Sequence, residues 1–155
     1  MPFKIDLGGL ESAMRRAMPA YFVEILRWMF TMVMIFGSML CGVILAAPKL
    51  RQNVAFIGTL ADNLKPFQAF IGVATAISSL IRLFWVPMGT VFVEDMLPGL
   101  LGTAAGAIVF LDALKTKKDP SAKPTLPEPW SMVLGIAAAV IGFVHMFVGW
   151  HAPVL

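Results

Sequence analysis

The stretch WMFTMVMIFGSMLCGVILAA, residues 28–47, decides the fold class, because none of its twenty residues carries a charge. A helix that crosses the hydrocarbon core of a bilayer needs about 20 mainly apolar residues. Of all 155 residues, 59% are hydrophobic and 14% are charged, whereas soluble domains carry about 25% charged residues. The sequence therefore predicts an all-α integral membrane protein.

Three further segments have the length and composition of a membrane span. Pro98 in the third of them falls three residues after Asp95, a suitable N-cap, and proline is tolerated in the first turn of a helix. We expect a single transmembrane domain over residues 20–155, preceded by an amphipathic N-terminal arm over residues 1–19. The four expected spans are residues 20–47, 66–86, 95–114 and 129–150.

Two shorter segments have the pattern of helices at a membrane surface. Residues 1–19 place apolar side chains about one helical turn apart, and Arg15 and Arg16 can meet lipid phosphates. Residues 50–64 place apolar side chains on one helical face, so we expect an interfacial helix there, whereas the polar, proline-rich residues 115–128 predict a loop. The apolar positions are Leu7, Leu10, Met14 and Met18 in the arm and Leu50, Val54, Ile57, Leu60 and Leu64 in the interfacial helix.

The second and fourth spans resemble each other over their whole length. Aligned at Pro66 and Pro129, PFQAFIGVATAISSLIRLF and PWSMVLGIAAAVIGFVHMF need no gap, and Arg82 falls opposite His145. Such internal similarity indicates a repeat. The identical pairs are Pro66/Pro129, Gly72/Gly135, Ala74/Ala137, Ala76/Ala139 and Phe84/Phe147.

The first and third spans match more weakly. The pattern from Ser38 to Gly42 corresponds to the pattern from Gly102 to Gly106, with a shift of one residue. We interpret the chain as two tandem helical hairpins. Because each hairpin crosses and returns, the halves would be related by a pseudo-twofold axis along the membrane normal, as in parallel repeats.

Small residues recur at helical spacing in all four spans. Lipid offers no hydrophobic drive to helix association, so close approach through small side chains must supply packing. We expect these faces to pack within the chain, and some of them to dock a neighbouring subunit. The candidate packing and assembly residues are Ser38, Gly42, Gly72, Ala76, Gly102, Gly106, Gly135, Ala139 and Gly142.

Charges in or beside the spans are candidate polar sites, because charge in a bilayer is costly and often functional. Glu24 and Arg27 stand three residues apart and can pair on one helical face. Arg82 can reach the headgroups or pair with Glu94 or Asp95 across the short second connection. The candidate interface residues are Glu24, Arg27, Arg82, Glu94, Asp95 and Asp112.

The loops decide the expected orientation. Seven basic residues lie in the first and third loops, against five on the opposite side. This balance favours cytoplasmic loops and external termini. Asp112 lies at the basic end of its span, where Lys115 can neutralise it.

Catalysis and cofactor binding find little support. Cys41 is the only cysteine, and its apolar surroundings indicate a small buried side chain. His145 and His151 lie six residues apart and project in different directions, so we expect neither haem nor metal, and an ordinary helix-end histidine at the interface. The chain has no phosphate-binding glycine loop and no active-site spacing of nucleophile and base. The sequence predicts a non-enzymatic protein without a cofactor.

Two functions fit these patterns. The first is a structural or accessory membrane subunit that assembles with itself or a larger complex through its small-residue faces. The alternative is a small transporter or channel with a polar pathway between the hairpins. Basic residues flank the apolar segments, so the expected partners are membrane lipids rather than nucleic acid, and the expected location is the bacterial inner membrane. The pathway would involve Thr75, Ser78, Ser79 and Arg82.

Overall fold

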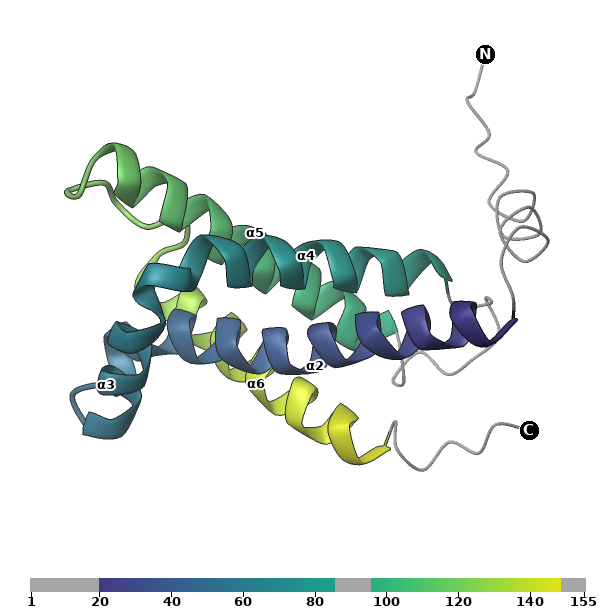
Figure 1. Ribbon diagram of the computed structural model, residues 1–155. Coiled ribbons are helices and arrows are strands. Elements are labelled where there is room, and N and C mark those ends of the chain that lie inside the picture. The colour runs from purple at the N-terminus through teal and green to yellow at the C-terminus, as the bar shows by residue number, and fades with distance from the viewer. Residues whose placement is uncertain (1–19, 86–95, 149–155) are drawn as a thin grey trace, which may run out of the picture.

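The structure, a computed structural model, describes residues 20–85 and 96–148 (Figure 1). Their regular structure is entirely helical. The N-terminal arm, Glu94, Asp95 and His151 lie outside the described residues. The elements are α2 (Ala20–Leu50), α3 (Ala55–Leu64), the 3₁₀ turn η1 (Lys65–Phe67), α4 (Gln68–Trp85), α5 (Leu97–Lys118) and α6 (Glu128–Val148).

Four helical runs in the described part are long and apolar enough to cross a membrane, as the sequence predicts. The second run joins α3, η1 and α4. The chain turns between α3 and α4 at Pro66, which has no backbone N–H to continue an α-helix. In Figure 1, α3 lies across the end of the bundle where α2 ends. The runs are Phe22–Leu50, Ala55–Phe84, Leu97–Lys118 and Glu128–Phe147.

Several helix ends differ from the sequence prediction. α2 continues to Leu50 rather than ending at residue 47, and α3 begins at Ala55 rather than at residue 50. The N-cap of α5 is Met96 rather than Asp95, although Pro98 does lie in the first turn. At the other end, α5 continues to Lys118, so the predicted loop begins four residues late. The helix stops at Asp119, which is extended because it precedes Pro120, and basic side chains in the last turn suit the helix dipole.

The most extensive pairings join α4 with α5 and α2 with α6. α2 also packs against α4 and α5, and therefore contacts every other long helix (Figure 1). The expected hairpins are α2 with α4 and α5 with α6. The closest neighbours thus lie between the two hairpins rather than within them.

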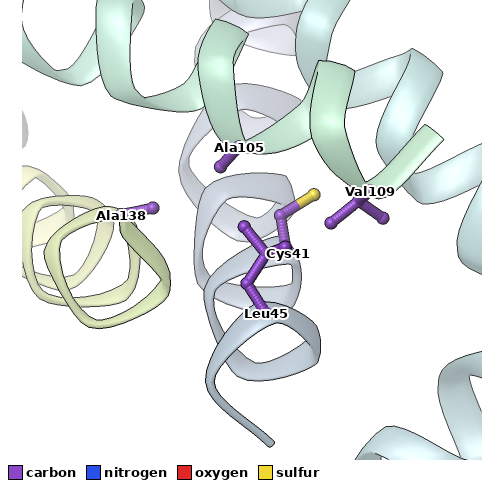
Figure 2. Close-up of a cluster of buried hydrophobic side chains, with 5 residues drawn as sticks. All are labelled: Cys41, Leu45, Ala105, Val109 and Ala138. Carbon is purple, nitrogen blue, oxygen red and sulfur yellow. The ribbon is translucent and has the colours of Figure 1, made fainter. Parts of the chain in front are cut away.

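The core lies where α2, α5 and α6 meet (Figure 2). Partly buried isoleucine and leucine side chains surround it. The outer surface is apolar over all four long helices, with exposed aromatic side chains on α2, α4 and α6, which is the surface that a helical bundle presents to lipid. The core residues are Cys41, Leu45, Ala105, Val109 and Ala138.

Candidate functional site

The contact between α4 and α5, called here the α4–α5 seam, is made backbone to backbone. A Cβ on Gly106 would stand 2.6 Å from the backbone nitrogen of Ala76 and 2.7 Å from the carbonyl oxygen of Gly72. A Cβ on Gly72 would stand 2.6 Å from the backbone nitrogen of Phe110 and 2.8 Å from the carbonyl oxygen of Gly106. Real Cβ atoms essentially never come closer than 3.0 Å, so this crossing requires glycine at both positions.

The contact between α2 and α6, the α2–α6 seam, has the same construction. A Cβ on Gly42 would stand 2.5 Å from the carbonyl oxygen of Gly135 and 2.7 Å from the backbone nitrogen of Ala139. A Cβ on Gly135 would stand 2.7 Å from the carbonyl oxygen of Gly42 and 2.8 Å from the backbone nitrogen of Ala46. In each seam, each glycine faces the carbonyl oxygen of the partner glycine. It also faces the backbone nitrogen of the residue four positions after that partner glycine.

The burial patterns of α4 and α6 also correspond position by position. Residues on the outer faces are exposed in both helices, and residues facing the seams are buried in both. The exposed pairs are Phe67/Trp130, Phe70/Val133, Ile77/Val140, Leu80/Phe143 and Phe84/Phe147, and the buried pairs are Gly72/Gly135, Thr75/Ala138, Ser79/Gly142 and Arg82/His145.

All nine small residues singled out in the sequence lie at helix contacts within this chain. Ser38 faces Gly102 across the contact of α2 with α5, and Gly142 packs against Ile35 and Met39 of α2. The small-residue faces are thus occupied inside one chain. Docking of a neighbouring subunit on some of these faces stays a prediction.

A polar stripe runs along the buried face of α4. Thr75 and Ser79 are 0% exposed, and Ser78 and Arg82 are 5% exposed. Burial of Arg82 differs from our expectation that its side chain reaches the headgroups. The structure brings together on one face the four residues assigned to a possible pathway.

The stripe meets hydroxyl and thiol groups of α2. The Thr75 hydroxyl donates to the carbonyl of Ile71 at 2.7 Å, and the Cys41 thiol donates to the Thr75 oxygen at 3.6 Å. The hydroxyls of Ser38 and Ser79 both face Gly102. Among the described residues, neither hydroxyl has a hydrogen-bond partner.

The charge pairs predicted from the sequence differ from what the structure shows. Glu24 and Arg27 are both exposed on α2, and within the described part of the chain no ion pair joins them. Asp112 accepts a hydrogen bond from the backbone N–H of Thr125 at 2.6 Å, so it fixes the loop back onto α5 rather than pairing with Lys115. The expected acidic partners of Arg82 lie outside the described residues.

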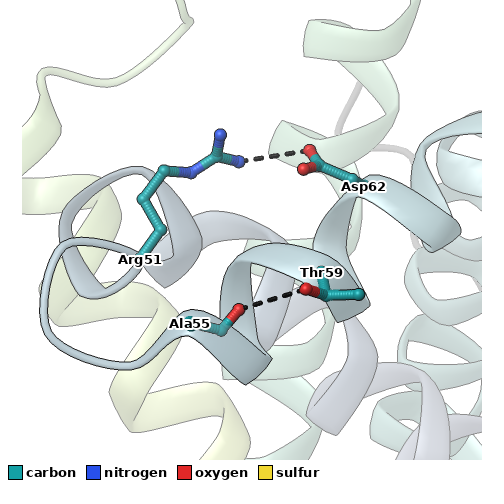
Figure 3. Close-up of polar contacts among 4 residues, drawn as sticks. All are labelled: Arg51, Ala55, Thr59 and Asp62. Carbon is teal, nitrogen blue, oxygen red and sulfur yellow. Dashed lines mark hydrogen bonds and ion pairs between the residues drawn. The ribbon is translucent and has the colours of Figure 1, made fainter.

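An ion pair that the sequence does not predict joins the turn after α2 to α3 (Figure 3). A guanidinium nitrogen of Arg51 lies 3.3 Å from a carboxylate oxygen of Asp62. Both side chains are about half exposed or more, at 47% and 64%. The pair stands eleven residues apart in the chain, and only the turn between α2 and α3 makes it visible.

A second missed feature is an apolar groove of about 150 Å³ beside the α2–α6 seam. Its walls come from α2, α3 and α6, and no single segment of sequence signals it. The lining residues are Gly42, Val43, Ala46, Leu50, Ile57, Gly135, Ile136, Ala139 and Val140.

His145, expected as a helix-end histidine at the interface, lies in the last turn of α6 and is buried in the bundle, at 5% exposure. Over residues 20–85 and 96–148, no group of three or more histidine, cysteine, aspartate or glutamate side chains could hold a metal ion.

The described residues form an all-helical bundle whose four long helical runs are consistent with a multi-pass membrane protein. A family model for a domain of unknown function matches residues 28–151, and the chain belongs to that family. No curated protein and no solved structure matches the chain.

Proposed function

We propose that the protein is a non-enzymatic structural or accessory subunit of a membrane, which assembles with itself or with a larger complex. The observation that carries this proposal is the pair of seams closed by direct backbone contact. Close backbone packing gives van der Waals contact over the length of a helix pair, which is the main source of stability between helices in lipid. A rigid bundle of this kind suits a scaffold.

The architecture that we propose is two fused helical hairpins, α2 with α4 and α5 with α6. The matching backbone contacts of Gly42 and Gly106 support it, as do the matching burial patterns of α4 and α6. Pseudo-twofold symmetry would exchange the two seams. It would also bring Cys41 onto Ala105 and Leu45 onto Val109, which are neighbours in the same core cluster.

The surface that we propose for assembly is the outer face of α6. The seams are occupied internally, and α6 is the least covered span, with 22% of its residues buried against 44% for the first span. Phe143 and Phe147 stand on this face with ring centroids 5.0 Å apart, and both are half exposed. Large aromatic side chains dominate the energetics of many interfaces.

Native mass measurement after gentle extraction into lipid nanodiscs tests this proposal. We expect the chain to appear as an oligomer or with a partner. Phe143→Ala with Phe147→Ala should release it, whereas Leu80→Ala with Phe84→Ala, the matched change on α4, should not. A wild-type chain that is a lone monomer in native-like lipid, with no co-extracted protein, would contradict assembly.

The location we propose is the bacterial inner membrane. Proteins that span the bacterial outer membrane do so as closed β-barrels, so an all-helical chain fits the inner membrane better. Separation of inner and outer membranes on a density gradient would show which fraction carries the protein.

A second candidate function is transport of a small solute between the hairpins. The polar stripe of α4 favours it, because α6 carries Ala138 and Gly142 where α4 carries Thr75 and Ser79. Buried arginine in a span is also costly and often marks a pathway. Proteoliposome flux that is lost in Arg82→Ala but kept in the matched variant His145→Ala, with both variants folded, would favour transport over the scaffold.

A further inference from the structure

The groove beside the α2–α6 seam has the size and chemistry of a hydrocarbon site. It holds about 150 Å³, and its lining is wholly apolar. An apolar protein cavity of about 150 Å³ stays dry and takes a molecule of the size of benzene, roughly six carbons. The groove opens outward between Ile136 and Val140, which are 42% and 52% exposed. A helix about 10 Å across is too thick for this space, whereas a segment of roughly six carbons of an acyl chain fits.

The groove is long in the direction of the membrane normal. It runs beside α2 from Gly42 to Leu50, which is about 12 Å at 1.5 Å per residue. Ile57 of the interfacial helix α3 closes the wall near Leu50. The deep end therefore lies inside the span, and the other end lies where α2 leaves it.

The corresponding position of the α4–α5 seam holds a large side chain instead. The backbone nitrogen of Ala46 approaches Gly135, and the backbone nitrogen of Phe110 approaches Gly72 in the same way. Ala46 lines the groove and carries only a methyl group, whereas the matching residue of the other seam, Phe110, carries an aromatic ring. The chain thus contains its own example of a residue that can occupy this position.

The shallow end of the groove is basic. Lys49 and Arg51 flank the lining residue Leu50, and Arg51 packs against Gly58, next to the lining residue Ile57. Arg51 is paired with Asp62, but both side chains are exposed, and such pairs are weak and exchange readily. Residues 49–65 and 112–128, at this end of the bundle, carry seven basic residues and four acids, so this end attracts anionic headgroups.

We infer that the groove binds one acyl chain of an anionic phospholipid, whose phosphate is held by Lys49 and Arg51. The apolar wall excludes water and holds the chain, and the basic end selects the headgroup. α3 closes the site from the interface. This lipid belongs to the folded unit and does not depend on the proposed assembly.

Native mass spectrometry tests the inference with phosphatidylglycerol and phosphatidylcholine supplied in equal amounts. The wild-type chain should retain one lipid, with phosphatidylglycerol preferred about fivefold, the ratio that one basic residue near an anionic surface gives. Lys49→Gln with Arg51→Gln should keep one lipid and lose the preference. The matched variant Lys117→Gln with Lys118→Gln removes two charges at the same end, away from the groove, and should keep both properties.

Two further variants test the hydrocarbon part of the site. Ala46→Phe, which copies Phe110 of the other seam, should abolish retention of either lipid. If Ala46→Phe does not fold, Val140→Phe narrows the groove from its half-exposed mouth and should reduce retention severalfold. The inference is overturned if wild-type protein retains both lipids equally, if the Lys117 and Lys118 variant loses the preference too, or if a folded groove variant retains lipid like the wild type.

Discussion

The α2–α6 seam and the α4–α5 seam share one backbone geometry and differ in side chains. In both, glycines meet so closely that a Cβ would overlap backbone atoms of the partner helix. α4 and α5 carry Thr75, Ser79 and Phe110, whereas α6 and α2 carry Ala138, Gly142 and Ala46 at the matching positions. The difference teaches that backbone packing sets the architecture. The side chains around it are free to build a polar stripe on α4, which meets α2 and α5, and a groove beside the α2–α6 seam.

The largest expected effect comes from adding one methyl group to either seam. Gly42→Ala and Gly106→Ala should each destabilise the fold by about 3 kcal/mol, because the new Cβ overlaps backbone atoms that cannot move alone. Unfolding in mixed micelles measures the change. Gly99→Ala is the control, because its Cβ would find neighbours no closer than 3.5 Å, and it should be neutral or stabilising. Unequal effects of Gly42→Ala and Gly106→Ala would break the equivalence of the seams.

The next effect sharpens the difference between the seams at Thr75. Its hydroxyl donates to Ile71 and accepts from Cys41, so Thr75→Val should destabilise the fold by about 1 kcal/mol. Ser79→Ala should change stability by less than about 0.5 kcal/mol, because the Ser79 hydroxyl has no hydrogen-bond partner among the described residues. The same unfolding assay compares them. Equal losses would mean that the Ser79 hydroxyl makes a contact of similar strength.

A smaller effect on stability is expected at α3. Among the described residues, the first hairpin has this helix in its loop and the second hairpin has no counterpart. Removing the Arg51–Asp62 pair with Asp62→Asn should change stability by at most about 0.5 kcal/mol, because both side chains are exposed. The effect should shrink further in 1 M salt, where the screening length is about 3 Å. A large change that persists in salt would show that the pair holds α3 in place.

The smallest effect lies in the loop of the second hairpin. The Ser121 hydroxyl and the Ser121 backbone N–H donate to Asp119 and lower the pKa of this carboxyl. A lowered folded-state pKa means that the stabilisation is present above the ordinary pKa and is lost as the pH falls through the folded value. Ser121→Ala should move the Asp119 pKa back toward its ordinary value, as NMR titration would show. An unchanged pKa would mean that the backbone N–H alone accounts for the shift.

Much of the helical layout follows from the sequence. The uncharged run of residues 28–47 and the proline-bounded repeats predict the long helices, with ends that differ by a few residues. The sequence did not predict that α5 extends to Lys118, because lysine is common both in loops and in the last turn of a helix. The predicted boundary between residues 64 and 66 coincides with the 3₁₀ turn at Pro66, because proline lacks the donor that α-helical bonding needs.

The site could be predicted only in part. Glycine spacing identifies faces for close packing, but one such face looks like another, so the pairing between hairpins could not be read from the sequence. Burial of Arg82 depends on neighbours from several helices. The groove depends on α2, α3 and α6 together, and on the small size of Ala46 where Phe110 could stand.

The equivalence of the seams is tested most directly by dipolar electron paramagnetic resonance with two matched label pairs in a Cys41→Ala background. One pair replaces Phe36 and Val140 across the α2–α6 seam, and the other replaces Leu100 and Ile77 across the α4–α5 seam; all four side chains are exposed. We expect the two distance distributions to coincide. Clearly different distributions would contradict two fused hairpins that share one crossing geometry.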